Sequence, residues 1–277
     1  MNAVGLLAID LDGTALRTDN TLSPAVARAL IAASESGITV AAASGRPYHS
    51  MPKQLLRLGC IDYVIASNGA AIYDRRGKRI YEDMMNEADV LRLLELTAGD
   101  DLIWEAFLNG ATYTDSRYLA DPLAYGCTEA YIDYVRGSRG GLTDMRKYIY
   151  DNRKTLDSVE YVCTDKAVRE SVRKRLEDNL EGLYITSSSE NFVEFMNKTA
   201  NKSNAVKKLC ATLNIKTQNT AAAGNADNDA DMIAHAGLGA AVENASPLCR
   251  AAADVILPSN DDDGVAELVR MILNSVA

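Results

Sequence analysis

The stretch Asp10-Leu11-Asp12-Gly13-Thr14 follows directly after the apolar run Leu6-Leu7-Ala8-Ile9. A short apolar run that ends at a glycine-containing loop is typical of a buried strand in a parallel sheet. Open α/β sheets bind their ligands at the carboxyl ends of such strands. Alternation places both Asp side chains on one side, and two close carboxylates cost free energy unless a cation or proton lies between them. The stretch therefore predicts a divalent metal site in which one carboxylate is free for covalent chemistry.

The composition excludes several classes of function. The chain has 277 residues, of which 47% are hydrophobic and 24% charged, and its net charge is −9. An acidic chain is unsuited to non-specific binding of nucleic acid or of an anionic membrane surface. The five cysteines are scattered without close pairs, which indicates reduced thiols, and no run reaches about 18 apolar residues. We expect a cytoplasmic protein whose partners include neither nucleic acid nor a membrane.

The two ends of the chain share one pattern. A helix signal at Ser23-Pro24 precedes an expected strand at 38–43, and another helix precedes the strand at 63–66. The same alternation of strands and helices returns towards the carboxyl end. This order predicts an α/β fold with a doubly wound parallel sheet, built from residues 1–84 and 192–277.

The middle of the chain has a different pattern, which predicts an inserted α+β domain at residues 85–191. Residues 88–96 are expected to form an amphipathic helix. The runs at 103–107 and 111–114 flank Asn109-Gly110, a strong signal for a β-hairpin. Trp104 and the tyrosines of this region are expected in its core and on its surface.

Polar residues follow several of the expected strands. They are Ser44-Gly45, Asn68-Gly69, and Gly224-Asn225 with Asn228-Asp229, and Lys202-Ser203 begins a helix. Each alone has an ordinary structural explanation, such as a turn, a helix cap or a solvated lysine. All of them are expected at the carboxyl edge of one sheet, and that combination indicates a functional site.

These motifs, in this order, resemble those of the haloacid dehalogenase superfamily, and more narrowly the Cof-type phosphatases with a type IIB cap. The first motif, residues 10–14, and the fourth, residues 224–229, are the most specific. The resemblance covers nearly the whole chain, including the position of the inserted cap between the second and third motifs. It implies an enzyme, a phosphomonoester hydrolase, with Mg²⁺ as its cofactor.

The resemblance also implies a role for each motif residue. Asp10 is expected to be the nucleophile that forms an aspartyl-phosphate, and Asp12 to exchange protons with the leaving alcohol and the water. Arg46 is expected either to contact the substrate or to pair with an acid on the cap. The expected metal ligands are Asp10, Asp12 through its backbone carbonyl, Asn225 and Asp229. The expected phosphate-binding residues are Leu11, Ser44, Gly45, Lys202 and Asn228.

One residue departs from the family pattern, because Asn225 stands where an Asp is usual. An amide oxygen can bind Mg²⁺ but brings no negative charge, so we predict a weaker metal site than three acids would give. The function that we expect is Mg²⁺-dependent hydrolysis of a small phosphorylated metabolite, such as a sugar phosphate. Two alternatives stay open: a phosphotransferase or mutase, and a binding or regulatory protein that has lost turnover.

Overall fold

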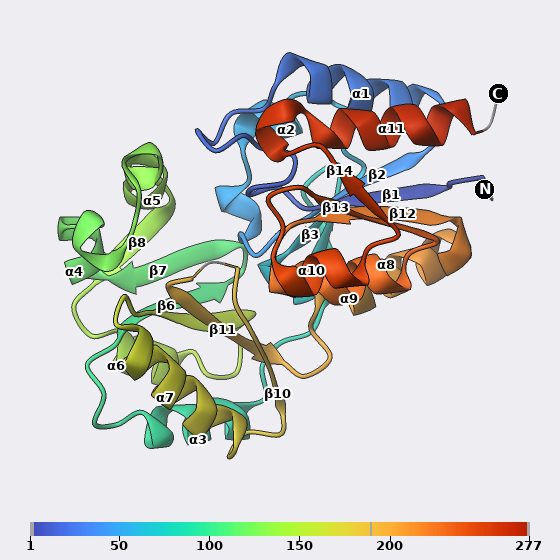
Figure 1. The fold of residues 1–277 in the computed structure, drawn as a ribbon. Helices are drawn as coiled ribbons and strands as arrows, with labels where there is room; N and C mark the ends of the chain where they lie inside the picture. Colours follow the sequence, from blue (N-terminus) through green and yellow to red (C-terminus); the bar gives the residue numbers. More distant parts are fainter. Residues whose placement is uncertain (1–2, 189, 276–277) are drawn as a thin grey trace.

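Two β-sheets organise the computed structural model, which describes residues 3–188 and 190–275 (Figure 1). The first sheet has eight strands in the order β14-β13-β12-β1-β2-β3-β4-β5. The strands from β14 to β3 are parallel, and β4 and β5 form an antiparallel hairpin at one edge. The strands of this sheet are β1 (Leu6–Ile9), β2 (Thr39–Ala43), β3 (Tyr63–Ala66), β4 (Ala71–Asp74), β5 (Arg79–Glu82), β12 (Thr220–Gly224), β13 (Leu238–Val242) and β14 (Val255–Leu257).

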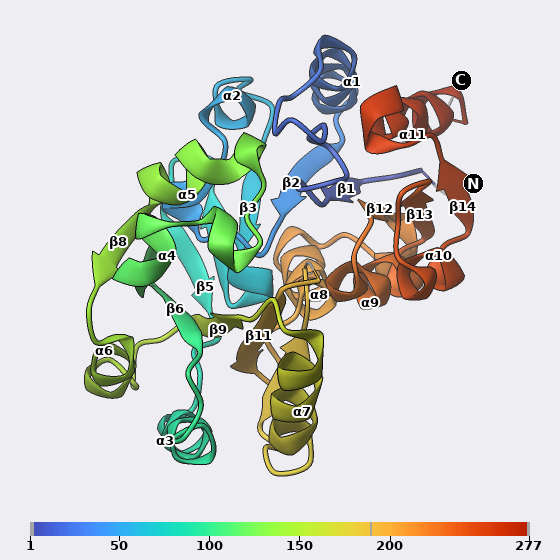
Figure 2. The same cartoon turned by 60° about the vertical axis from the view of Figure 1, so that its left-hand side comes forward.

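Helices cover both faces of the first sheet. In β1, Leu7 and Ile9 pack into one apolar core, whereas Leu6 and Ala8 pack into another. This alternation explains why an apolar strand needs a helical layer on each side. Figure 2 shows α1 beside α11 in one layer and α8, α9 and α10 in the other. The helices are α1 (Pro24–Glu35), α2 (Lys53–Leu56) and α11 (Gly264–Asn274) on one face, and α8 (Lys202–Leu213), α9 (Ala230–His235) and α10 (Pro247–Ala252) on the other.

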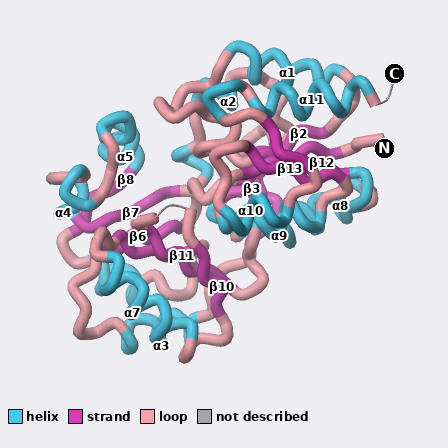
Figure 3. The backbone as a smooth tube through the Cα atoms, viewed as in Figure 1, coloured by secondary structure: helices cyan, strands magenta, loops and turns pink. Residues whose placement is uncertain are grey.

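The second sheet has six strands in the order β10-β11-β9-β6-β7-β8, and its strand pairs are antiparallel except for β7 and β8. It lies beside the first sheet, with α3 and α7 below it and α5 above it in the view of Figure 3. None of the helices within the described ranges is long and apolar enough to cross a membrane. The elements are β6 (Ile103–Leu108), β7 (Ala111–Asp115), β8 (Arg139–Leu142), β9 (Ser158–Val162), β10 (Leu183–Thr186), β11 (Phe192–Asn197), α3 (Glu87–Leu96), α4 (Ser116–Ala120), α5 (Ile132–Ser138), α6 (Met145–Asp151) and α7 (Lys166–Glu177).

The expected hairpin at Asn109-Gly110 is confirmed. The φ angles are 51° at Asn109 and 78° at Gly110, so both residues lie in the left-handed region that a tight two-residue hairpin turn requires. The turn joins β6 to β7 in register from Leu108 opposite Ala111. The sequence therefore determines this part of the second sheet locally.

The expected return to the parallel layer at Phe192 is wrong for Phe192–Asn197. These residues form β11, which pairs antiparallel with β9 and β10 in the second sheet. A short apolar run indicates a strand but not its neighbours, because strand pairing is decided by residues far apart in sequence. The predicted core segment 192–277 thus begins with a strand of the inserted module.

Candidate active site

Asp10 and Asp12 follow β1 at the carboxyl edge of the first sheet, where they border a cavity of about 540 Å³. The other side of the cavity is formed by the second sheet and by the segment that carries α4 and α5. Predicted polar residues from three separate strand ends, those of β1, β2 and β12, meet here. The predicted site residues that line the cavity are Asp10, Asp12, Ser44, Gly45, Arg46, Asn225 and Asn228.

Lys202 lies behind Asp10 and is buried to 99%. Its Nζ donates to Asp10 Oδ1 at 2.7 Å and to Asp229 Oδ1 at 2.7 Å. Burial disfavours a charged ammonium, but the two carboxylates outweigh that cost and raise the pKa of Lys202. Lys202 is therefore a fixed cation that joins the first and fourth motifs.

The position of Lys202 depends on the loop after β3. Lys202 is the first residue of α8, and the Asn201 side chain caps this helix by accepting from the Asn204 amide at 2.8 Å. Gly69 lies against the cap with a φ of 105°, and a Cβ atom added to it would be 2.4 Å from the Asn201 carbonyl oxygen. Only glycine allows the two loops to approach this closely.

The surroundings of Asp10 contain too little positive charge to balance its carboxylate and that of Asp229. Burial and the neighbouring Asp229 raise the pKa of the Asp10 carboxyl to about 7, although Lys202 acts in the opposite direction. Two buried carboxylates share one lysine, which leaves one negative charge without a partner. The electrostatics of this edge are therefore those of a cation site.

The oxygen atoms next to Asp10 are spaced as Mg²⁺ ligands would be. One end of the Asn225 carboxamide lies 3.1 Å from Asp10 Oδ2 and 3.0 Å from the Asp12 carbonyl oxygen. If the amide nitrogen occupies this position, Asn225 donates to both of these oxygens. If the amide group is rotated by half a turn, its oxygen occupies the same position and can bind a metal. Ligands at right angles around Mg²⁺ are about 3.0 Å apart, given bonds of about 2.1 Å. The donors present thus fit a magnesium ion.

The three candidate metal ligands differ in chemical type: one is a carboxylate, one a backbone carbonyl and one a side-chain amide. Within residues 3–188 and 190–275, no three His, Cys, Asp or Glu side chains converge as a metal cluster. Asp229 is occupied elsewhere, because its Oδ2 accepts from the amides of Asn225 and Ala226 at 3.0 Å each. In this state Asp229 shapes the loop that holds Asn225 and bonds to Lys202, which places it behind the candidate ligands.

The predicted phosphate-binding residues form the neighbouring wall. The Ser44 hydroxyl accepts from the Arg46 amide at 3.1 Å, and Asn228 donates its side-chain N–H to Asn68 Oδ1 at 2.8 Å. The Leu11 side chain is fully buried in the apolar core, so only its backbone can serve a ligand. Of this group, Leu11 and Lys202 do not line the cavity themselves.

Arg46 pairs with Asp12, an acid of the first domain, and not with an acid on the inserted module. Its Nε donates to Asp12 Oδ2 at 2.7 Å, and a second nitrogen binds Asp12 Oδ1. The inserted module contributes aromatic side chains: the guanidinium lies 4.0 Å from the centre of the Tyr134 ring, and the Tyr131 hydroxyl donates to Asp12 Oδ1 at 3.3 Å. The expectation that these tyrosines belong only to core and surface is wrong, because both line the cavity.

Two further acids line the same cavity and are not among the predicted site residues: Glu160 of β9 and Glu194 of β11. Burial and Glu105 raise the pKa of Glu160 well above its ordinary value, and burial raises that of Glu194. Glu105, Glu160 and Glu194 are each the one charged residue of their strand. A buried charge at matching positions of three strands is the signal that could have identified them.

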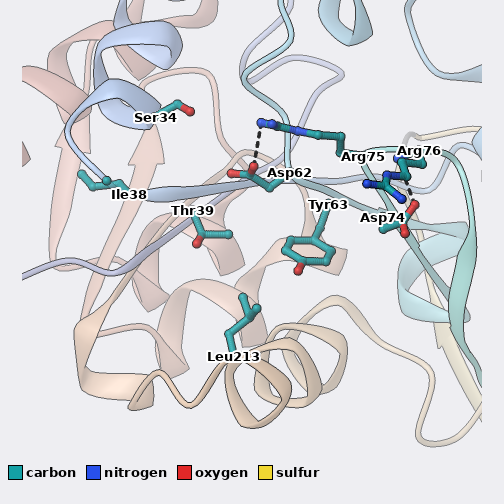
Figure 4. Close-up of a pocket in the computed structure, with 10 residues that line it drawn as sticks. Ser34, Ile38, Thr39, Asp62, Tyr63, Asp74, Arg75, Arg76 and Leu213 are labelled. Atoms are coloured by element: carbon teal, nitrogen blue, oxygen red, sulfur yellow. Dashed lines mark hydrogen bonds and ion pairs between the residues drawn. The ribbon is translucent and has the colours of Figure 1, made fainter.

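A second hollow, of about 430 Å³, lies at the opposite edge of the first sheet, near the start of β2 and β3 (Figure 4). Both of its carboxylates accept hydrogen bonds from nearby residues. Arg75 binds Asp62 at 2.9 Å, and the Asp74 carboxylate accepts from the backbone amides of Arg76 and Lys78. None of the predicted site residues lies there, so the candidate active site is the cavity at the carboxyl edge.

The chain as a whole is similar to several known proteins. The sequence model of the haloacid dehalogenase-like hydrolases matches residues 7–269. Phosphatase YwpJ of Bacillus subtilis is 29% identical over 284 residues, covering 97% of this chain and 99% of YwpJ. A solved haloacid dehalogenase-like hydrolase from B. subtilis has a TM-score of 0.83 at 27% identity, covering 96% of this chain and 99% of that one. The subclass IIB sugar phosphatase BT4131 shares the fold, with a TM-score of 0.82 at 19% identity, covering 97% and 98%. The predicted fold class, including the inserted cap, is confirmed.

Proposed function

The chain belongs to the haloacid dehalogenase-like hydrolases and is an enzyme of the phosphatase type, and from that premise we propose that it hydrolyses a small phosphomonoester with Mg²⁺ and a phosphorylated Asp10. The observation that carries this proposal is the environment of Asp10. Its Oδ1 is bound by Lys202, and its Oδ2 faces Asn225 at the edge of the cavity. A carboxylate fixed at both oxygens beside a buried cation is suited to attack a phosphorus atom.

In the proposed reaction, Asp10 attacks the phosphorus while the bond to the alcohol oxygen breaks, and Asp12 supplies the proton that the alcohol takes. Water then attacks the phosphorylated Asp10, and Asp12 accepts the proton of that water. Arg46 holds the Asp12 carboxyl group at the edge of the cavity through two hydrogen bonds, which positions that group for both proton transfers. Lys202 balances charge at Asp10 throughout.

We propose that Asp10, the Asp12 carbonyl and Asn225 hold the metal, with Asp229 behind them. When bound, Mg²⁺ offsets the negative charge of the phosphoryl oxygens, so that a carboxylate can approach them. The Ser44 hydroxyl, the amides of Leu11 and Gly45, and Asn228 are proposed to hold those oxygens from the other side.

The size of the cavity supports a small substrate. A volume of about 540 Å³ is in the range of metabolite and cofactor sites. Aromatic side chains from the cap, including Phe107, Tyr134 and Phe192, form much of the wall opposite Asp10. We therefore propose a sugar phosphate or a related metabolite, and not a phosphorylated protein or nucleic acid.

The test is release of inorganic phosphate from p-nitrophenyl phosphate and a panel of metabolite phosphates, with MgCl₂ or with EDTA. We expect turnover that needs Mg²⁺ and is lost in Asp10→Asn. Acid quenching during turnover should trap phosphate on the wild-type protein but not on Asp10→Asn. Turnover without any trapped phosphoprotein, or turnover that survives in Asp10→Asn, would contradict the proposed mechanism.

A further inference from the structure

Three glutamates form a row across the second sheet. Glu160 of β9 lies opposite Glu105 of β6 on one side and opposite Glu194 of β11 on the other. Alternate residues of these strands, such as Trp104 and Phe195, pack into the apolar core under the cap helices. The glutamates must therefore project from the other face, which looks towards the catalytic edge. Their exposed fractions are only 0%, 5% and 3% in the order of the chain.

The row holds three carboxyl groups, and only Glu105 forms an ion pair among the described residues. In the part of the chain that the structure describes, its one ion-pair partner is Arg139, whose Nε and Nη2 bind Glu105 at 2.6 and 3.1 Å. This pairing lowers the pKa of Glu105 although burial opposes it. Glu160 and Glu194 are left without a cation of their own.

One carboxylate oxygen of Glu194 makes no hydrogen bond to the residues that the structure describes. Its Oε1 accepts from the Ser188 hydroxyl at 2.6 Å, whereas its Oε2 is buried and has no hydrogen-bond donor among the described residues. Leaving a buried carboxylate oxygen without a partner costs free energy comparable with a lost hydrogen bond or more. Because Glu160 and Glu194 both line the cavity, a ligand inside it can reach them.

The walls next to these acids suit a cation. The cavity is lined by the two glutamates and by Phe107, Tyr118, Tyr134 and Phe192. Arg46 and Arg139 also line it, but Arg46 is paired with Asp12 and Arg139 with Glu105, so neither neutralises Glu160 or Glu194. Aromatic faces attract cations, as Tyr134 already does with Arg46. An ammonium group brings three N–H donors and one positive charge, which are the two things that the row lacks.

We propose that Glu160 and Glu194 bind an ammonium group on the alcohol part of the substrate, so that the preferred substrate is a phosphomonoester that also carries a primary amine. This inference rests on the proposed function, because it assigns the leaving group of the same reaction. The phosphoryl group lies at Asp10, and the amine extends across the cavity to the cap. Selection for the amine then comes from the acid row, and the catalytic residues do not contribute to it.

The kinetic test compares two substrates that differ in one group, glucosamine 6-phosphate and glucose 6-phosphate. We expect kcat/KM at pH 7 to favour the amine by about tenfold or more. The ratio of the two values should fall below about threefold in Glu194→Gln and in Glu160→Gln, and stay high in the control Glu170→Gln, which removes an exposed acid from α7. A ratio near one in the wild type, or a high ratio that persists in both row variants, would overturn the inference.

A binding test does not depend on turnover. Calorimetry on Asp10→Asn with Mg²⁺ should show glucosamine 6-phosphate binding at least tenfold more tightly than glucose 6-phosphate or N-acetylglucosamine 6-phosphate, which lacks the charge. Equal binding of all three would overturn the amine assignment even if p-nitrophenyl phosphate is hydrolysed. Absence of all hydrolysis together with preferential binding of the amine would overturn the proposed function and leave the amine site supported.

Discussion

Replacing Asn225 by Asp tests the least conventional part of the candidate metal site. The new carboxylate would stand about where the amide now lies, 3.1 Å from Asp10 Oδ2. Two unit charges at that separation repel by about 5 kcal/mol at an effective dielectric constant of about 20. Protonation and local relaxation relieve part of this cost, so we expect the metal-free variant to lose about 2–3 kcal/mol of stability. For a chain of this size that corresponds to a Tm lower by roughly 5–10 °C.

Mg²⁺ should reverse this loss. The ion carries two charges and lies closer to each carboxylate than the carboxylates lie to each other, so its attraction exceeds their repulsion. We expect a net gain of at least about 1.4 kcal/mol in metal binding, which is a tenfold lower Mg²⁺ concentration at half-saturation. The assay is Tm as a function of MgCl₂ concentration, because a ligand of the folded state raises Tm according to its affinity.

The control for this variant is Asn179→Asp, which adds the same charge at an exposed position on the cap. It should leave both the metal-free Tm and the Mg²⁺ dependence close to those of the wild type. If Asn225→Asp and the wild type reach half-saturation at the same Mg²⁺ concentration, Asn225 does not bind the metal and the reasoning fails.

Three further changes probe the same framework. Lys202→Met leaves two buried carboxylates without a cation and should lower the free energy of unfolding, measured in urea, by about 3–5 kcal/mol. The control Lys208→Met removes an exposed lysine from the same helix and should change that free energy by less than about 0.5 kcal/mol. Equal effects of the two substitutions would refute the buried pairing. Gly69→Ala should lower the free energy of unfolding by about 1–3 kcal/mol or more, because Gly69 has a left-handed φ and a Cβ atom there would be 2.4 Å from the Asn201 carbonyl oxygen. Gly99→Ala should leave that free energy unchanged, because the space around Gly99 is open. Burial and Glu105 raise the pKa of Glu160, so its ionisation favours the unfolded chain. The stability of the wild type relative to Glu160→Gln should therefore be greatest below about pH 4.5 and should fall by up to about 1.4 kcal/mol per pH unit above it, until Glu160 ionises in the folded protein. Parallel pH profiles of the two proteins would contradict this.

The local signals in the sequence were sufficient for most of the fold. The hairpin at Asn109-Gly110 follows from two residues that tolerate positive φ, and the helix at Ser23-Pro24 follows from a cap in which Ser23 accepts from the Val26 amide. The strand at Phe192–Asn197 was assigned to the wrong sheet, because its apolar pattern is compatible with either sheet. Strand neighbours are a tertiary property, and periodicity within one strand does not contain them.

The candidate site also has parts that the sequence predicts and parts that it does not. Asp10, Asp12 and the fourth motif could be placed from sequence, because parallel strands bring their carboxyl ends to one edge whatever the side chains. The pairing of Arg46 with Asp12 could not, since a long side chain has several acids within reach. The contacts of Tyr131 with Asp12 and of Tyr134 with Arg46 could not be predicted from the sequence either.

By itself the sequence determined the order of the elements, the catalytic edge and the chemical types gathered there, because these follow from local conformational preferences and chain connectivity. Only the tertiary structure decided which charges remain unpaired. Glu160 and Glu194 are unremarkable acids in the sequence, and they become a candidate recognition surface because three strands align them in one buried row above Asp10. Burial and register depend on the whole chain, and the cost of an unpaired charge depends on both.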